Sequence, residues 1–263
     1  MGMQRCFPQQ RPQRRPDTGD SVLIGAGAFT LIELLVVIAI IIVLTGLVIL
    51  PMTNINSAGD LTKTTADIAG VLEEARAYAM ANNTYVWVGI AESDATVDAS
   101  KTQTQPGTGR VAVAVAASKD GTRGYDVSAP SLSSSNLVAI SQLRHFENAH
   151  LGALNTTSSA AASAGGMRRP VISDNQYIIT GTSTSATNFA WPLTGTPQYQ
   201  FGAVINFDPS GVARIQTAGN RDNIGQYLEI GLQQAHGNVV ATGSNVAAIQ
   251  IDCMNGATRI YRP

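Results

Sequence analysis

The chain has 263 residues, of which 44% are hydrophobic and 13% charged, and its formal net charge is −1. This length fits one domain of moderate size together with a membrane segment. The charge balance excludes a broad basic surface for nucleic acid, so no nucleic-acid partner is expected. Two cysteines, Cys6 and Cys253, are too few for a disulfide framework.

The first 28 residues form a basic leader in front of the most apolar run of the chain. Their four arginines and two aspartates give a net charge of +2. From Ala28 to Leu50, only Thr30, Glu33, Thr45 and Gly46 are not plainly apolar. As a helix, this run extends over roughly 34 Å, enough to span a bilayer. The positive-inside rule places the leader in the cytoplasm and the rest of the chain outside.

Two simple interpretations of this segment leave something unexplained. A secretory signal peptide has its small residues after a short apolar core, but here Gly25 to Ala28 come before a longer run. A plain membrane anchor explains the length and the orientation. It does not explain Glu33, because an acidic residue in the middle of a membrane helix costs about 2.5–3.5 kcal/mol, although the helix dipole reduces that cost near a helix start.

The order of leader, small residue, Phe29 and Glu33, followed by an apolar run, resembles the start of type IV prepilins and type II secretion pseudopilins. The resemblance implies cleavage between Ala28 and Phe29 by a prepilin peptidase and methylation of the new amine of Phe29. Glu33 is then the fifth mature residue, and its carboxylate meets the N-terminal ammonium of a neighbouring subunit in a filament. The family usually has Gly before the cut, so cleavage after Gly27 stays open, as does a true start at Met3.

The sequence predicts that the helix continues beyond the apolar run. Pro51 either kinks the helix, as in pilins, or ends it. After residue 60, apolar residues recur at helical spacing and predict a face that lies on a globular domain, with the helix reaching about Ala81. These residues are Leu61, Ile68, Val71, Leu72, Ala75 and Ala79.

After Asn82, short β-type runs alternate with segments rich in Gly, Ser, Thr and Asn. The predicted strands are Tyr85–Ile90, Arg110–Ala117, Leu137–Leu143, Gln176–Thr180, Phe201–Phe207, Val212–Gln216, Gln226–Leu232, Ala247–Asp252 and Thr258–Tyr261. The predicted exposed loops are Ser93–Gly109, Ser118–Ser135, Asn155–Met167 and Gly181–Pro197.

Two stretches narrow the resemblance. "DIAGVLEEARAYAMANNTYVWVGI", residues 67–90, is similar to the passage from helix to first strand in minor pseudopilins of the H type. "INFDPSGVARI", residues 205–215, is similar to a turn between late strands in the same group. Residues 208–211 of that stretch, Asp-Pro-Ser-Gly, also predict a tight turn, since Pro fixes φ and Gly allows a positive φ.

The sequence shows no catalytic pattern. His145, His150 and His236 are scattered and are expected at the surface or in loops, and no Cys pair, P-loop or nucleophile turn is present. Asp208, Asp222 and Asp252 are candidate calcium ligands, but they lack a spaced acidic loop and are better explained as turn residues. "MRRP", residues 167–170, is expected to be a solvated basic spot. The aromatic residues Tyr85, Trp87, Trp191, Tyr199 and Phe201 fit core packing as well as a sugar-binding surface.

These observations predict an α+β fold, a pilin-like lollipop with a long N-terminal helix, first transmembrane and then amphipathic, packed on a C-terminal antiparallel β-sheet domain. The expected parts are a cytoplasmic leader peptide (1–28), a transmembrane and assembly helix (29–50), its amphipathic continuation (51–82) and an extracytoplasmic β-rich pseudopilin domain (83–263). Because the leader retains Cys6 in the cytoplasm, no disulfide with Cys253 is expected.

The expected function is that of a minor pilin or pseudopilin in a type II secretion or type IV pilus-like filament, with no enzymatic activity, cofactor or metal. Expected partners are prepilin peptidase, other pilin or pseudopilin subunits, the inner-membrane assembly machinery and the lipid bilayer. The expected location is the bacterial inner (plasma) membrane, crossed once, with the C-terminal domain periplasmic. A static membrane-anchored surface or adhesion protein is the alternative, and an anchored hydrolase would need a polar site that the sequence does not show.

Overall fold

The structure is a computed structural model that describes residues 30–123, 132–154, 167, 169–170, 172, 174–185, 187–217, 221–223, 225–242 and 245–263. The side chains of residues 45–58, 217 and 221–223 lie outside this description. The chain divides into two compact units, residues 1–50 and residues 51–263. The predicted cleavage site at Ala28 and Phe29 lies outside the described residues.

Helix α1 (Leu31–Ala81) is a single helix of 51 residues. The six apolar residues predicted to form one face between Leu61 and Ala79 are all at most 2% exposed, so that prediction is confirmed. They share one core with strands of both main sheets. The helix ends where predicted, because Asn83 takes a left-handed conformation (φ 48°) and the Thr84 amide donates to the carbonyl oxygen of Ala79.

Pro51 does not end the helix, since α1 continues for 30 residues beyond it to Ala81. The interpretation of Pro51 as a simple helix end is therefore wrong. A kink at Pro51 stays a prediction.

The first main sheet is built around the hairpin of β1 and β2, which are antiparallel from Val86 opposite Ala117 to Asp94 opposite Gly109. The order of its strands is β11-β10-β9-β1-β2-β3, and β4 also pairs with β2. Their bounds are β1 (Val86–Asp94), β2 (Gly109–Ser118), β3 (Leu137–Ala139), β4 (Arg144–Glu147), β9 (Ala203–Phe207), β10 (Ala213–Thr217) and β11 (Arg221–Asn223).

Both faces of β1 and β2 are buried, and the alternation of their side chains separates two cores. Val86, Val88 and Ile90 face the core that contains α1. Trp87, the next residue along from Val86, faces an aromatic core with the hairpin of β7 (Phe189–Trp191) and β8 (Tyr199–Phe201). Gly89 lets that hairpin approach closely, because a Cβ there would lie 2.5 Å from the ring of Phe201.

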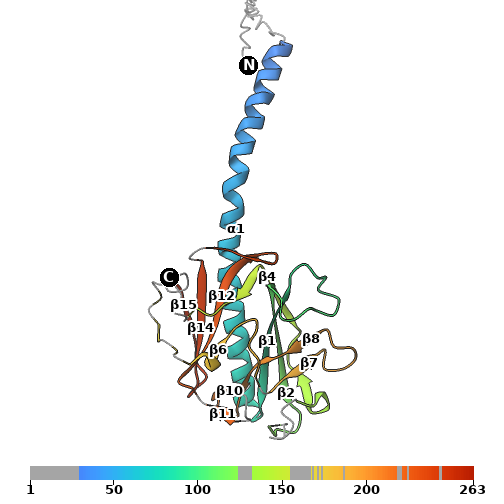
Figure 1. Ribbon diagram of the computed structural model, residues 1–263, viewed down its shortest axis with the longest axis vertical. Coiled ribbons are helices and arrows are strands. Elements are labelled where there is room, and N and C mark those ends of the chain that lie inside the picture. The colour runs from blue at the N-terminus through green and yellow to red at the C-terminus, as the bar shows by residue number, and fades with distance from the viewer. Residues whose placement is uncertain are drawn as a thin grey trace, which may run out of the picture. The chain divides into compact units, whose positions relative to one another are not determined.

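The second main sheet has the order β13-β12-β14-β15, with β5 antiparallel and β6 parallel to β12. Its strands are β5 (Ala149–Leu151), β6 (Ile178–Ile179), β12 (Tyr227–His236), β13 (Val239–Val240), β14 (Val246–Asp252) and β15 (Thr258–Tyr261). Two 3₁₀ turns, η1 (Ser134–Asn136) and η2 (Asn175–Tyr177), complete the elements. In Figure 1, the part of α1 that belongs to the second unit lies between β12–β14 and β1–β2.

The expected fold class, the α+β pilin-like lollipop with a transmembrane and then amphipathic helix on an antiparallel β-sheet domain, is wrong as stated. Within the described part of the chain, no helix combines the length and apolar character needed to cross a bilayer. Among the described strands, the β-rich part forms two main sheets that are antiparallel except for the pair of β6 and β12.

The nine predicted strands are present, several of them shorter than predicted, as β1, β2, β3, β6, β9, β10, β12, β14 and β15. Strands β4, β5, β7, β11 and β13 were not predicted, nor was β8 apart from Phe201, and β7 lies inside the expected loop Gly181–Pro197. Each of these has at most four residues and gives little periodic signal of its own. Of the expected loop Asn155–Met167, only Met167 is described.

Candidate functional site

Glu33 lies in the first turn of α1 and closes a capping box with Thr30. The Thr30 amide and hydroxyl donate to Oε2 of Glu33 at 2.9 and 2.8 Å, and the Glu33 amide donates to the Thr30 hydroxyl at 3.3 Å. This arrangement satisfies two amides that a helix start leaves without partners. The carboxylate therefore has a local partner in the single chain and is held at the very start of the helix.

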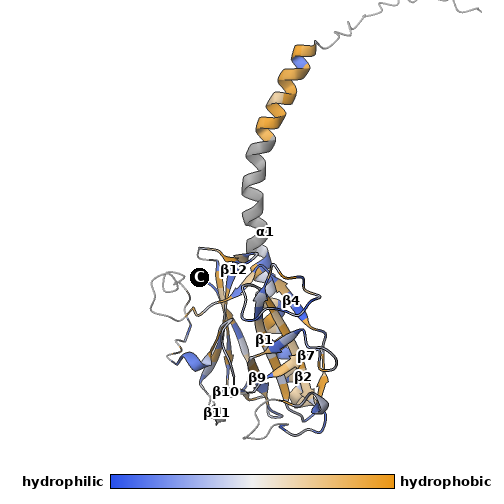
Figure 2. Cartoon of the chain, turned by 45° about the vertical axis from the view of Figure 1, so that its right-hand side comes forward, coloured by the Kyte–Doolittle hydropathy of each residue, from blue (hydrophilic) through white to orange (hydrophobic). Residues whose placement is uncertain are grey.

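The apolar residues that follow Glu33 present an exposed hydrophobic surface. Every large apolar side chain from Leu31 to Leu44 is between 46 and 82% exposed. Figure 2 shows this stretch of the helix in the hydrophobic colour, with a hydrophilic position near its start. Contiguous apolar surface of this kind marks a site that another molecule or a lipid phase covers.

Two of the candidate calcium ligands, Asp208 and Asp252, bond to turns, whereas Asp222 lies in β11. Asp208 caps the turn between β9 and β10, where its Oδ1 accepts from the amides of Ser210 (2.9 Å) and Val212 (3.1 Å). Gly211 has φ 84°, as the predicted tight turn requires. Burial alone raises the pKa of Asp208, but hydrogen bonds from Ser210, Val212 and Arg214 lower it below its usual value.

The other two candidates do not complete a metal site. Asp252 accepts a hydrogen bond from the amide of Met254, and the side chain of Asp222 lies outside the described residues. No group of three His, Cys, Asp or Glu residues among those described is arranged to hold a metal ion.

The three histidines differ more than the sequence suggested. His150, in β5, donates or accepts through Nδ1 at 2.8 Å from Glu92 Oε1, and Glu92 is 1% exposed. Glu92 also accepts from the amides of Gly109 and Leu151, so this carboxylate joins the two main sheets. The imidazole of His145 lies tilted against the Tyr199 ring, with 5.4 Å between the ring centroids, and partial burial lowers its pKa. His150 lies in a strand and not in a loop, and its side chain is 25% exposed, so it is partly at the surface.

The basic spot at residues 167–170 is not a solvated face at Arg169. Its guanidinium makes a two-pronged pair with Glu229, with Nε to Oε2 at 2.7 Å and Nη2 to Oε1 at 2.9 Å. The side chains are 9 and 0% exposed. The pattern of charged residues in the sequence cannot reveal this pairing, because the partners are 60 residues apart.

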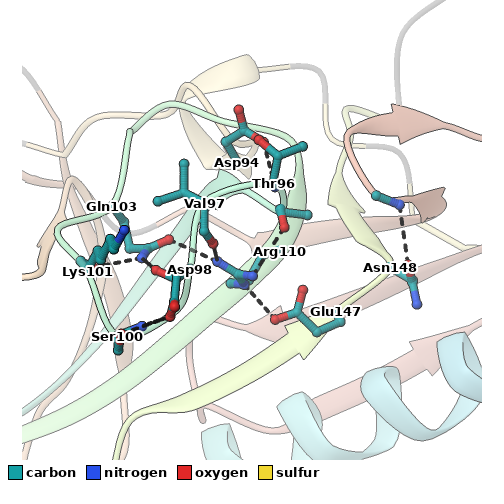
Figure 3. Close-up of polar contacts among 12 residues, drawn as sticks. Asp94, Thr96, Val97, Asp98, Ser100, Lys101, Gln103, Arg110, Glu147 and Asn148 are labelled. Carbon is teal, nitrogen blue, oxygen red and sulfur yellow. Dashed lines mark hydrogen bonds and ion pairs between the residues drawn. The ribbon is translucent and has the colours of Figure 1, made fainter.

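Arg110 organises the loop between β1 and β2 (Figure 3). Its guanidinium donates to the carbonyl oxygens of Val97 (2.6 Å) and Ala95 (3.3 Å), to Gln103 Oε1 (3.0 Å) and to Glu147 Oε1 (2.5 Å). Asp94 and Asp98 make local turns in the same loop, and the amides of Thr96 and Ser100 lower the pKa of these two carboxyls. The expected exposed loop at Ser93–Gly109 is confirmed only in part, because Ser93 and Gln103 are buried and the loop is internally bonded.

The aromatic residues that the sequence left open belong mainly to packing. Trp87, Tyr199 and Phe201 are at most 1% exposed, and Tyr85 and Trp191 pack partly buried against the same core. Cys253 is a free, buried thiol, and burial raises its pKa to about 11. Neither observation indicates catalysis or a sugar-binding surface among the described residues.

No known protein family, curated protein or solved structure matches the chain. The function must therefore be inferred from the residues and their geometry.

Proposed function

We propose that the chain is a minor pilin or pseudopilin subunit of a type II secretion or type IV pilus-like filament. Prepilin peptidase cuts it between Ala28 and Phe29 and methylates the amine of Phe29. The carrying observation is the exposed apolar surface from Leu31 to Leu44, which begins with a carboxylate at Glu33. Inner-membrane assembly machinery then transfers the subunit from the bilayer of a bacterial inner membrane into the filament.

The carboxylate of Glu33 provides the physical reason for assembly in this proposal. A lone carboxylate is costly among apolar helices, but one that meets an ammonium from a neighbouring subunit favours assembly and sets the axial register. The capping box holds the carboxylate at the helix start, four residues from Phe29. In a bundle of subunits, that position faces the end at which each new N-terminal amine lies.

The alternative is a static membrane-anchored surface or adhesion protein. The capping box itself favours this alternative, since Thr30 already satisfies the Glu33 carboxylate inside one chain. A plain anchor needs Glu33 only to begin its helix, and it needs no processing. The two proposals therefore differ in what the charge of Glu33 does.

Crosslinking to other subunits, divided by membrane content, separates the two proposals. Glu33→Leu removes the carboxylate, whereas Thr30→Val keeps it and removes only the hydroxyl of the capping box. We expect Glu33→Leu to reduce incorporation at least tenfold with membrane content unchanged or increased, and Thr30→Val to have a much smaller effect. Normal incorporation of Glu33→Leu favours the static anchor.

N-terminal mass analysis of the membrane-extracted protein tests the processing step. We expect a methylated chain that starts at Phe29. A chain that retains Arg14 and Arg15, or that is cut after the apolar run, contradicts the proposal.

A further inference from the structure

The loop between β14 and β15 contains Asn255 followed by Gly256, the one Asn-Gly step in the sequence. Asparagine before glycine is prone to spontaneous deamidation, because glycine has no side chain to keep its amide nitrogen away from the asparagine side chain. That nitrogen attacks Cγ of the asparagine, ammonia leaves and a five-membered succinimide forms. Water then opens the ring to aspartate or isoaspartate. Asn255 is exposed, so water reaches its side chain.

Hydrogen bonds within the loop hold the reacting groups. The Gly256 amide, whose nitrogen must act as the nucleophile, donates to the carbonyl oxygen of Asp252 at 2.6 Å. The Asn255 side chain is held at both ends, since its Oδ1 accepts from the Ala257 amide at 2.8 Å and its Nδ2 donates to Asp252 Oδ2 at 3.3 Å. Ring closure requires the Gly256 nitrogen to lose its proton, and with it this hydrogen bond, and requires Nδ2 to leave Asp252. The closed loop therefore slows the reaction, which proceeds when the loop opens locally.

Helix α1 holds the same loop from outside. Two residues after Gly256, the amide of Thr258 donates to Oε1 of Glu73 at 2.8 Å. Gly256 itself is buried, and a Cβ there would lie 2.9 Å from Cδ of Arg76 and would collide with the carbonyl oxygen of Gly211. The loop can open only by leaving these neighbours, so contacts with α1 add to the protection.

We propose that Asn255 is a latent deamidation site that α1 keeps closed, so that opening of the loop becomes a permanent chemical change. Deamidation places a carboxylate at residue 255 beside Asp252, and like charges in contact destabilise the closed loop. Isoaspartate also adds one carbon to the main chain, for which the close packing of Gly256 on Gly211 leaves no room. A loop that has reacted therefore cannot close as before. The proposal does not depend on assembly into a filament and applies equally to a static anchored protein.

Peptide mapping by mass spectrometry of the full chain, incubated in detergent at mildly alkaline pH, measures conversion at residue 255. A synthetic peptide of residues 249–261 gives the rate without a folded loop. We expect the native chain to react about tenfold more slowly than the peptide, and the product to contain isoaspartate as well as aspartate. Equal rates overturn the proposal, because the loop then gives no protection. A peptide that does not react also overturns it, and so does aspartate alone, which would indicate direct hydrolysis.

Two neighbouring glutamates on α1 give matched variants. Glu73→Ala removes the acceptor of the Thr258 amide, whereas Glu74→Ala removes the partner of Arg144 in β4 and leaves the loop untouched. Glu73→Gln keeps a side-chain oxygen that can accept the same hydrogen bond. We expect Glu73→Ala to react about fivefold faster than the native chain and the other two variants to react at the native rate. If Glu73→Ala and Glu74→Ala react equally fast, α1 does not keep the loop closed and the proposal is overturned.

The consequence of the reaction is tested without incubation. Asn255→Asp carries the charge of one product, and Asn255→Ser removes the same side-chain amide without adding a charge. We expect the Tm of Asn255→Asp at pH 7 to lie about 2 °C below that of Asn255→Ser, because the new carboxylate meets Asp252. Equal Tm values would show that the reacted loop closes as before, which overturns the proposal.

Discussion

Helix α1 carries two apolar stretches with opposite surroundings. From Leu31 to Leu44, large apolar side chains point in every direction and are exposed, whereas from Leu61 to Ala79 they form one face and are buried against both main sheets. A helix that is apolar all round needs cover on every side, which a single β-rich unit cannot provide. The amphipathic stretch needs cover on one face only, and its own chain supplies it. The stretch from Leu61 to Ala79 therefore stabilises its own chain, and the stretch from Leu31 to Leu44 is left for other molecules or lipid to cover.

Truncation gives the largest expected effect. Removal of residues 1–50 takes away the exposed stretch and leaves the second unit intact, so we expect a soluble, β-rich, monomeric domain. Removal of residues 1–79 also strips the buried face from the core and leaves apolar strand residues uncovered, so we expect aggregation. Size-exclusion chromatography and circular dichroism measure both. A monomeric and equally stable product of the longer truncation would show that the helix face is not needed to cover the core.

Glu229 and Glu33 differ in the same way as the two apolar stretches. Glu229 is buried with its partner, Arg169, in its own chain, whereas Glu33 is exposed at the start of the apolar stretch. Arg169→Leu leaves a buried carboxylate without its cation, and we expect a loss of about 3–5 kcal/mol in the free energy of unfolding. Chemical denaturation measures this loss.

The double variant Arg169→Leu/Glu229→Leu is the control for that experiment. It removes both charges from the buried site, so we expect it to recover most of the lost stability. If the double variant is as unstable as Arg169→Leu, then lost packing and not the unpaired charge causes the effect. If Arg169→Leu is as stable as the native chain, the pair is not buried in solution.

Matched substitutions within α1 test the two stretches side by side. Leu72 is 0% exposed and Ile38 is 50% exposed. We expect Leu72→Ala to lower the free energy of unfolding of the second unit by about 2–5 kcal/mol, because it leaves a cavity in the core. We expect Ile38→Ala to leave that free energy unchanged, since the side chain has no place in the core. Equal effects would show that both stretches pack on the same unit.

The fold could be predicted from the sequence where the pattern of apolar residues is regular over a long stretch. The helix face from Leu61 to Ala79 and the alternating strands β1 and β2 follow this rule. The turn at residues 208–211 was also predictable, because Pro209 and Gly211 carry their conformational preferences locally. Short strands such as β11 and β13 were not, since pairing with longer neighbours and not their own residues makes them strands.

The polar contacts also divide into local ones, which the sequence could reveal, and long-range ones, which it could not. Thr30 and Glu33 are three residues apart and match a capping box, so that contact could have been found in the sequence. The pairs Glu92–His150 and Arg169–Glu229 join residues 58 and 60 positions apart. Only the packing of β5 against the hairpin of β1 and β2, and of the segment at residue 169 against β12, brings these groups together. Long-range polar contacts therefore required the structure.

Replacement of Asp208 is expected to change stability the least. Its turn lies at the C-terminal end of α1, which is buried within the same chain. Its turn packs on that end, since a Cβ at Gly211 would lie 2.8 Å from the Met80 sulfur. The folded pKa of Asp208 lies below the unfolded value of about 3.9, since hydrogen bonds from Ser210, Val212 and Arg214 outweigh burial. A depressed folded pKa contributes stability that is present above the unfolded pKa and is lost as pH falls through the folded pKa.

We therefore expect Asp208→Asn to lower the Tm of the second unit by about 2 °C at pH 7, and this difference to shrink as pH falls below about 4. Asp60→Asn, at an exposed position of α1, removes the same charge away from this turn and serves as the control. Thermal unfolding from pH 7 to pH 2.5 measures both variants against the native domain. A difference for Asp208→Asn that stays constant over this range would show that the carboxylate contributes through its shape and neutral hydrogen bonds, because a contribution from its charge must vanish once the native residue is protonated.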